Sequence, residues 1–163
     1  MAFTLTSRAF AEGADIPIRY TCDGENRAPH LTWSGTPDGT RSLTLIVDDP
    51  DAPGGIFTHW VLYDIPPEIR ELNENEAGAT VGIHGRNSFG KAGFGGPCPP
   101  HGDPPHRYMF TLAAVDVPSL GLSGARSRED VDAAMETHVI GIARLTGRYQ
   151  RQRAARGRGS ASQ

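Results

Sequence analysis

The sequence predicts a mainly β, antiparallel domain with one substantial helix near its C-terminal end. Two observations support this. The chain holds 20 Gly and 13 Pro among 163 residues, and together these exceed the usual share of roughly one residue in eight, which is typical of a loop-rich fold. Several short runs also alternate apolar and polar residues between turn residues, the pattern of strands with one buried face.

Five strands are expected along the chain. The clearest alternates Leu43, Leu45 and Val47 on one face with polar residues and Ile46 on the other. Between the fourth and fifth strands, an acidic stretch is expected to be a solvated loop and residues 78–105 a long Gly/Pro loop, a feature that is usually functional or disordered. The expected strands are Phe3–Thr6, Leu31–Trp33, Ser42–Asp48, Thr58–Ile65 and His106–Asp116, and the acidic stretch contains Glu68, Glu71, Glu74 and Glu76.

The C-terminal part of the domain is predicted to be helical. Ser127 and Asp130 form a start that resembles a capping box. Apolar residues then recur at steps of three and four, which places them on one helical face. Gly147 is expected to end the helix. The members of that face are Val131, Met135, His138, Ile142, Leu145 and Tyr149.

The charge distribution divides the chain into a domain over residues 1–150 and a basic tail over residues 151–163. Of 16 Lys and Arg, five lie from Arg148 onward, which leaves 11 against 19 Asp and Glu in the rest. An acidic body argues against a nucleic-acid-binding domain, because affinity for phosphate backbones needs clustered positive charge. We expect the tail to be a solvated, disordered end, with contacts to nucleic acid or an anionic membrane as the alternative.

The sequence also lacks the patterns of a membrane span and of a secretory signal. No apolar run approaches the roughly 18 residues of a membrane span, and the N-terminal residues lack the basic start and apolar core of a secretory signal. We therefore expect a cytoplasmic protein without integral membrane association. Cys22 and Cys98 are then most simply free thiols, and a disulfide between them is the alternative for an exported protein.

Three polar clusters lie where expected strands meet turn-rich loops. Asp49 and Asp51 follow the third strand, His59 begins the fourth, and His106 and Tyr108 begin the fifth. Each cluster also admits a structural interpretation. Asp often caps turns through its own side chain, and a single His at the end of a strand is often a structural residue. Together they suit a small phosphate or carboxylate, because imidazole and phenol groups donate hydrogen bonds and a Gly-rich loop can turn its N–H groups inward. Asp49 would then accept either from a His ring, which it would hold charged, or from a monoprotonated phosphate or a ligand ammonium, and either role favours a small protonated or zwitterionic ligand.

Sharper motifs fail on their context. Gly85–Lys91 approaches a phosphate-binding loop but lacks the following hydroxyl and helix. Two His with Asp49 have the ligand types of an iron triad but no defined geometry. Cys98 lies in a stiff Pro-rich segment without a nearby base in sequence. We expect no metal and no cofactor.

The chain resembles the phosphatidylethanolamine-binding protein family, in its bacterial branch often called Raf-kinase-inhibitor-like. The resemblance covers roughly residues 2–150 and depends on the order and spacing of four motifs. These are Asp49-Pro-Asp-Ala-Pro53, Thr58-His-Trp60, Gly95-Gly-Pro-Cys-Pro-Pro100 and His106-Arg-Tyr108.

This resemblance implies a β-sandwich-like core of antiparallel strands with a C-terminal helix and few other helices. It also implies a pocket that accepts phosphate, acetate or a phospholipid headgroup, and a cis Ala52–Pro53 peptide bond. The pocket residues carried over are Asp49, Asp51, His59, Gly95, Gly96, Pro97, Pro99, His106 and Tyr108.

The function we expect is a non-enzymatic binding module for a small anionic or zwitterionic ligand. Such a module would modulate a partner protein, a kinase or a protease, and the resemblance suggests that it forms a homodimer. The alternative is a small hydrolase or lyase that uses the His, Asp and Tyr groups of the pocket.

Overall fold

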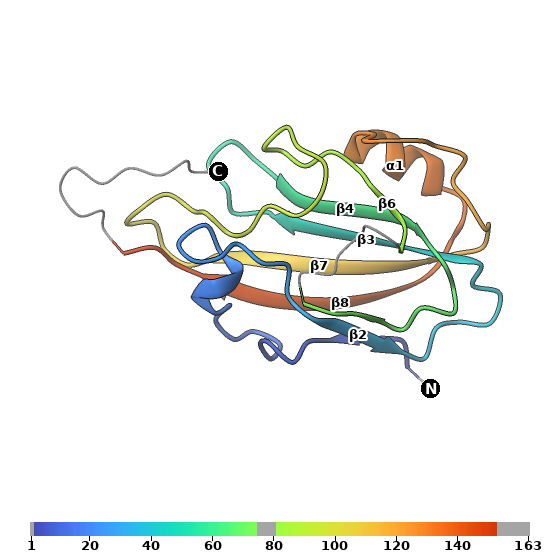
Figure 1. The fold of residues 1–163 in the computed structure, drawn as a ribbon, viewed down its shortest axis with the longest axis horizontal. Helices are drawn as coiled ribbons and strands as arrows, with labels where there is room; N and C mark the ends of the chain where they lie inside the picture. The colour runs from blue at the N-terminus through green and yellow to red at the C-terminus, as the bar shows by residue number, and fades with distance from the viewer. Residues whose placement is uncertain (1, 75–80, 153–163) are drawn as a thin grey trace.

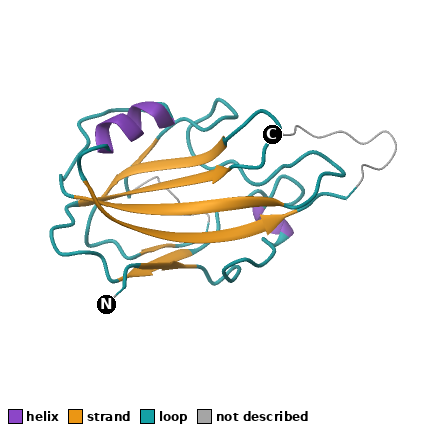
Figure 2. Ribbon diagram, turned by 180° about the vertical axis from the view of Figure 1, so that it is seen from behind, coloured by secondary structure: helices purple, strands orange, loops and turns teal. Residues whose placement is uncertain are grey.

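The computed structural model describes residues 2–74 and 81–152, and strands make up most of its regular structure (Figure 2). The α-helix α1 and the short 3-10 helix η1 lie at opposite ends of the molecule (Figures 1 and 2). In chain order the elements are β1 (Thr4–Thr6), η1 (Ile18–Tyr20), β2 (Leu31–Ser34), β3 (Ser42–Asp49), β4 (Phe57–Ile65), β5 (Glu71–Leu72), β6 (Ile83–His84), β7 (His106–Val115), α1 (Arg128–Met135) and β8 (Val139–Tyr149).

The strands form two antiparallel sheets. The smaller has the order β1-β2-β5 and the larger the order β6-β4-β3-β7-β8. The alternation expected in β3 is confirmed, because Leu43, Leu45 and Val47 belong to the main core while Ile46 belongs to a second cluster. The main core lies between the two sheets, and the second cluster joins the opposite face of the larger sheet to α1 through Val131 and Met135. The predicted mainly β, two-layer fold is therefore confirmed.

The prediction of a long C-terminal helix is partly wrong. Ser127 does cap α1, since its hydroxyl accepts a hydrogen bond from the Asp130 N–H, but the helix ends at Met135. The chain then turns and continues as β8, which pairs with β7 over ten register positions. The apolar spacing misleads because Leu145 and Tyr149 are four residues apart, a distance that fits one face of a helix and one face of a strand equally well.

The loop assignments between β4 and β7 also need correction. Glu71 is paired in β5, and Glu74 makes ion pairs with Arg19 and Arg27 at 2.8 Å, so the acidic stretch is anchored where the structure describes it. Glu76 lies outside the described residues. The Gly/Pro region from residue 81 onward is irregular apart from β6.

The expected free thiols are wrong, because Cys22 and Cys98 form a disulfide with their Cα atoms 5.4 Å apart. A backbone hydrogen bond of 3.1 Å from the Cys22 N–H to the Pro97 carbonyl holds the two segments together. The sequence could not supply that proximity. In the chain-entropy account, closing a loop of this length stabilises the fold by about 4 to 5 kcal/mol.

The expectation of a cis Ala52–Pro53 bond is also wrong, because no peptide bond in the described residues is cis. The Gly55 N–H donates to the Ala52 carbonyl at 3.0 Å, which closes a four-residue turn. Pro53 is the second residue of this turn, a position that trans proline favours.

The basic tail begins later than expected. Arg148 belongs to β8, and Arg151 is buried. The remaining basic residues of the tail, Arg153, Arg156 and Arg158, lie outside the described residues, so the disorder of that segment stays a prediction. No helix in the described part of the chain is long and apolar enough to cross a membrane.

Candidate functional site

The antiparallel register brings three of the predicted polar clusters to one end of the larger sheet. β3 ends at Asp49, and its neighbour β7 begins at His106. Val47, Phe110 and Tyr108 all belong to the core between the sheets. Because side chains alternate along a strand, Asp49 and His106 share that inner face. The neighbouring Asp48 faces the other way and pairs with Arg128 of α1 at 2.9 Å.

A buried carboxylate is the centre of the cluster. Asp49 is fully buried, and its Oδ2 lies 2.6 Å from Nδ1 of His106. Its Oδ1 accepts from the Asp51 N–H at 2.8 Å, and the Tyr108 hydroxyl also donates to the Asp49 carboxylate. A buried carboxylate needs such donors because isolated burial of its charge is very costly. The structure therefore brings Asp49, Asp51, His106 and Tyr108 into direct contact.

The electrostatics of the cluster favour a charged His106 ring. Burial by itself lowers the pKa of His106, but hydrogen bonds to Asp49 and Asp103 outweigh it and raise that pKa above the usual value. Burial raises the pKa of Asp49, with the His106 hydrogen bond opposing it. Burial and then Asp49 raise the pKa of the Tyr108 phenol above its ordinary range, so this group remains a neutral donor.

His59 contacts Tyr108 and Gly95 from the neighbouring strand β4. The register of β3 and β4 shifts between Val47 and Asp48, which leaves His59 as an extra residue on β4. Such bulges re-aim side chains, often beside functional sites. The His59 ring is edge-on to Tyr108 with centroids 5.2 Å apart, and its Nδ1 donates to the Gly95 carbonyl at 2.7 Å.

The Gly/Pro loop is split between two neighbourhoods. Gly95 contacts His59, and its own N–H donates to the His59 carbonyl at 2.9 Å. Gly96, Pro97 and Pro99 instead contact the turn after η1 and the C-terminal segment: the Gly96 N–H donates to Asn26 at 2.9 Å, the Pro97 carbonyl accepts from Cys22, and the Pro99 carbonyl accepts from Arg151.

Two cavities flank the cluster. The first, of about 410 Å³, opens beside His106, where Asp51 and Arg107 form a bidentate ion pair with both hydrogen bonds at 2.9 Å. That pair lowers the pKa of Asp51 to about 2. The second, of about 310 Å³, lies beside the disulfide and Gly95. The first cavity is lined by Asp51, Asp103, Pro104, Pro105, His106 and Arg107, and the second by Cys22, Asn26, Asn87, Phe89, Lys91, Phe94, Gly95, Gly96 and Cys98.

Sequence analysis missed Asp103, which faces the second ring nitrogen of His106. Its Oδ2 lies 3.0 Å from His106 Nε2, and its side chain is 35 % exposed. The signal was available, since Asp103 precedes His106 by three residues and two prolines fix the intervening chain. Among residues 2–74 and 81–152, no group of three or more His, Cys, Asp or Glu side chains is arranged so that it could hold a metal ion.

Several known proteins are similar to this chain in fold and in sequence. A UPF0098 protein from Aquifex aeolicus is 49% identical over 148 residues, which cover 89% of this chain and 86% of the relative. The crystal structure of Escherichia coli YbcL, described as a member of the mammalian PEBP family, superposes with a TM-score of 0.86 at 34% identity, over 92% of this chain and 99% of YbcL. A Mycobacterium tuberculosis protein named LppC, a candidate lipoprotein, is 40% identical over 152 residues, or 90% of this chain and 72% of LppC.

The family assignment follows from the extent of the match as well as from these relatives. Residues 6–150, which include every strand of the larger sheet and the whole Asp49–His106 cluster, match the family described as phosphatidylethanolamine-binding protein. The chain belongs to the phosphatidylethanolamine-binding protein family.

Proposed function

We propose that this chain is a non-enzymatic binding module whose ligand is a small anion, a phosphate or a carboxylate, held at Nε2 of His106. One observation carries the proposal. The His106 ring donates from Nε2 to the carboxylate of Asp103 at 3.0 Å, at the wall of a cavity of about 410 Å³. A carboxylate oxygen of the chain itself thus occupies the position that we assign to the ligand.

The buried side of His106 supports this assignment. Asp49 accepts from Nδ1 at 2.6 Å, which fixes the ring orientation and favours the doubly protonated, charged form. Charge-assisted hydrogen bonds to an anion are roughly twice as strong as neutral ones. The ligand would displace the partly exposed Asp103 side chain, so binding includes a competition between two anions.

The charges around the cavity bear on the ligand class. Asp51 and Asp103 are acidic, whereas His106 and Arg107 are basic, and Arg107 is already paired with Asp51. A polyanion would be repelled by the two carboxylates. A monoanion, or a zwitterion such as phosphoethanolamine whose ammonium could meet a carboxylate, fits better. The protein partner, a kinase or a protease, would present the same chemistry on a phosphorylated side chain.

An NMR titration with phosphate, acetate and phosphoethanolamine tests the proposal. Saturable shifts are expected at His106, Arg107 and Asp103, and they should vanish in His106→Ala. Asp103→Asn keeps the shape of the side chain and removes the competing charge, so it should tighten phosphate binding about threefold to tenfold. The matched control is Asp38→Asn, an exposed carboxylate in a distant turn, which should change nothing.

The pH dependence gives a second measurement. Binding should weaken as the pH rises above neutrality, because the imidazolium loses its proton. Affinity that stays flat from pH 5 to 9, or shifts that persist in His106→Ala, would reject the charged role of His106. If His106→Ala fails to fold, the comparison of Asp103→Asn with Asp38→Asn still decides.

The hydrolase or lyase alternative and the compartment require their own tests. Turnover of a panel of phosphate and carboxylate esters that disappears in His106→Ala would replace binding by catalysis. The disulfide favours an oxidising compartment over the cytoplasmic location expected from the sequence. Thiol trapping in the native cell, followed by mass spectrometry of the Cys22 and Cys98 peptides, distinguishes the two locations.

A further inference from the structure

We propose that the Cys22–Cys98 disulfide is a thiol–disulfide exchange site: an external thiolate attacks Cys22, and Cys98 leaves as a thiolate stabilised by Arg151. The disulfide lies outside the Asp49–His106 cluster, and its exchange does not depend on anion binding.

The two cysteines differ in exposure. Cys98 is only 1 % exposed, whereas Cys22 is partly exposed. Both residues line the cavity of about 310 Å³ beside Gly95 and Gly96. Because Cys22 is the more exposed of the two, we assign it as the point of attack. Because exchange depends on which sulfur is attacked, this asymmetry directs the reaction.

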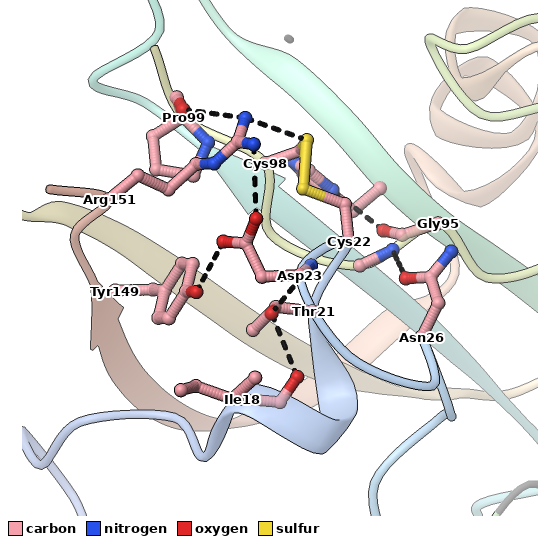
Figure 3. Close-up of a disulfide and its surroundings, with 12 residues drawn as sticks. Ile18, Thr21, Cys22, Asp23, Asn26, Gly95, Cys98, Pro99, Tyr149 and Arg151 are labelled. Atoms are coloured by element: carbon pink, nitrogen blue, oxygen red, sulfur yellow. Dashed lines mark hydrogen bonds and ion pairs between the residues drawn. A yellow bond between two sulfur atoms is a disulfide. The ribbon is translucent and has the colours of Figure 1, made fainter. Parts of the chain in front are cut away.

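A buried guanidinium lies against the sulfur that would leave. Nη1 of Arg151 lies against Sγ of Cys98, at 3.4 Å (Figure 3). The Arg151 side chain is only 1 % exposed. Burial of a charge is costly, so this Arg is fixed by several partners: Nη1 also donates to the Pro99 carbonyl, and the Arg151 carbonyl accepts from the Gly102 N–H at 3.1 Å. A cation in this position favours a thiolate over a thiol on Cys98.

The other charged groups near the sulfur moderate this effect. Nη2 of Arg151 pairs with Asp23 at 3.0 Å, and Asp23 also accepts from the Tyr149 hydroxyl at 2.5 Å. Asp23 thus orients the guanidinium and offsets part of its charge. Lys91 lines the same cavity but is exposed. The guanidinium in direct contact with Sγ of Cys98 therefore favours a thiolate there, and a thiol of lower pKa leaves faster.

The exchange step balances without a cofactor. The attacking thiolate forms a new disulfide bond with Cys22 as the Cys22–Cys98 bond breaks, and the electron pair of that bond goes to Cys98. With a dithiol, its second sulfur then displaces Cys22 as a thiolate. The dithiol is oxidised by two electrons to a disulfide and gives up two protons. The protein is reduced by two electrons and, once both thiolates are protonated, takes up two protons.

The test follows reduction of the folded, full-length protein. Incubation with glutathione, a monothiol, followed by acid quenching and peptide mass spectrometry should find the mixed disulfide on Cys22. Reduction by dithiothreitol should be first order in the dithiol under native conditions. A mixed disulfide on Cys98, or a reduction rate that rises only in proportion to the unfolded fraction in urea, would overturn the proposal and leave a purely structural cross-link.

Variants of Arg151 test the leaving group. Arg151→Gln should slow reduction about threefold, the size of change expected when the pKa of a leaving thiol rises by about one unit, and Arg151→Lys should slow it less. The matched control is Arg126→Gln, which removes an exposed Arg paired with Asp130 and should leave the rate unchanged.

Arg151→Gln could also loosen the fold and speed reduction by exposing the bond. A measurement that does not depend on access is the thiolate absorbance of Cys98 in Cys22→Ser as a function of pH. Its midpoint should lie below the usual value near 8.5 and rise by about one unit when Arg151→Gln is added. A midpoint that Arg151→Gln leaves in place would refute the role of Arg151.

Discussion

Replacement of His106 by alanine should destabilise the fold strongly, because it removes a donor from a carboxylate that has no access to water. Asp49 is fully buried, and its Oδ2 lies 2.6 Å from His106 Nδ1. Removal of one partner of a buried pair costs about 3 to 5 kcal/mol, a large part of the roughly 5 to 15 kcal/mol that stabilises a typical domain.

Urea denaturation followed by tryptophan fluorescence measures this cost, since Trp33 and Trp60 are both buried. With a slope of about 2 kcal/mol per molar urea, the midpoint should fall by about 2 M. The matched control is His138→Ala. His138 is also 2.8 Å from a carboxylate, that of Asp116, but the two side chains are 38 % and 42 % exposed, so the expected loss is about 0 to 1 kcal/mol.

A double-mutant cycle separates the pair from the rest of the site. Asp49→Asn removes the buried charge and keeps its shape, so the loss caused by His106→Ala should shrink by about 2 kcal/mol in that background. Additive losses would mean that His106 stabilises the fold through packing and not through Asp49. A loss no larger than that of His138→Ala would refute the reasoning outright.

Three further outcomes follow from the contacts of individual groups. The raised pKa of His106 contributes stability that is complete below the unfolded value near 6.5 and is lost as the pH rises through the folded pKa, so the urea midpoint should fall over that window in the wild type and not in His106→Ala. The pKa of Asp51, lowered to about 2, contributes stability above pH ~4 that is lost as the pH falls toward 2; because Asp51 and Arg107 are partly exposed, Asp51→Asn should cost only about 1 kcal/mol at pH 7 and flatten acid denaturation curves in this range. Ser127→Ala removes the N-cap of α1 and should lower the free energy of unfolding by about 1 kcal/mol in the same urea assay.

The strands were predictable where one pattern admits one structure. Ser42–Asp49 alternates around a buried face, and its bounds differ from the expected ones by a single residue. β8 was not predictable from spacing alone, because its buried Leu145 and Tyr149 satisfy both periods. The β-branched residues Val139, Ile140 and Ile142 and the internal Gly141 were the contrary signal, since all four lower helix propensity.

The site was predictable only in part, for a reason that lies in its connectivity. Asp49, His106 and Tyr108 meet because β3 and β7 are neighbours, which two strong strands with polar ends already suggested. Asp103 and Arg151 lie in irregular segments, where contacts depend on the path of the chain in space. The same holds for the disulfide, whose partners are 76 residues apart.

The two chemical features of this end of the molecule depend on different parts of the chain. The Asp49–His106 pair joins two adjacent strands of the larger sheet, so its geometry is fixed by the β3–β7 ladder. His59 is oriented by Gly95, in the same loop that carries Cys98. Opening of the disulfide would therefore change the loop that carries Gly95 and Cys98, and with it the position of His59. The His106 ring, held by Asp49, would stay in place. Reduction of the disulfide is then expected to move the His59 ring against Tyr108, while the His106 ring keeps its hydrogen bond to Asp49.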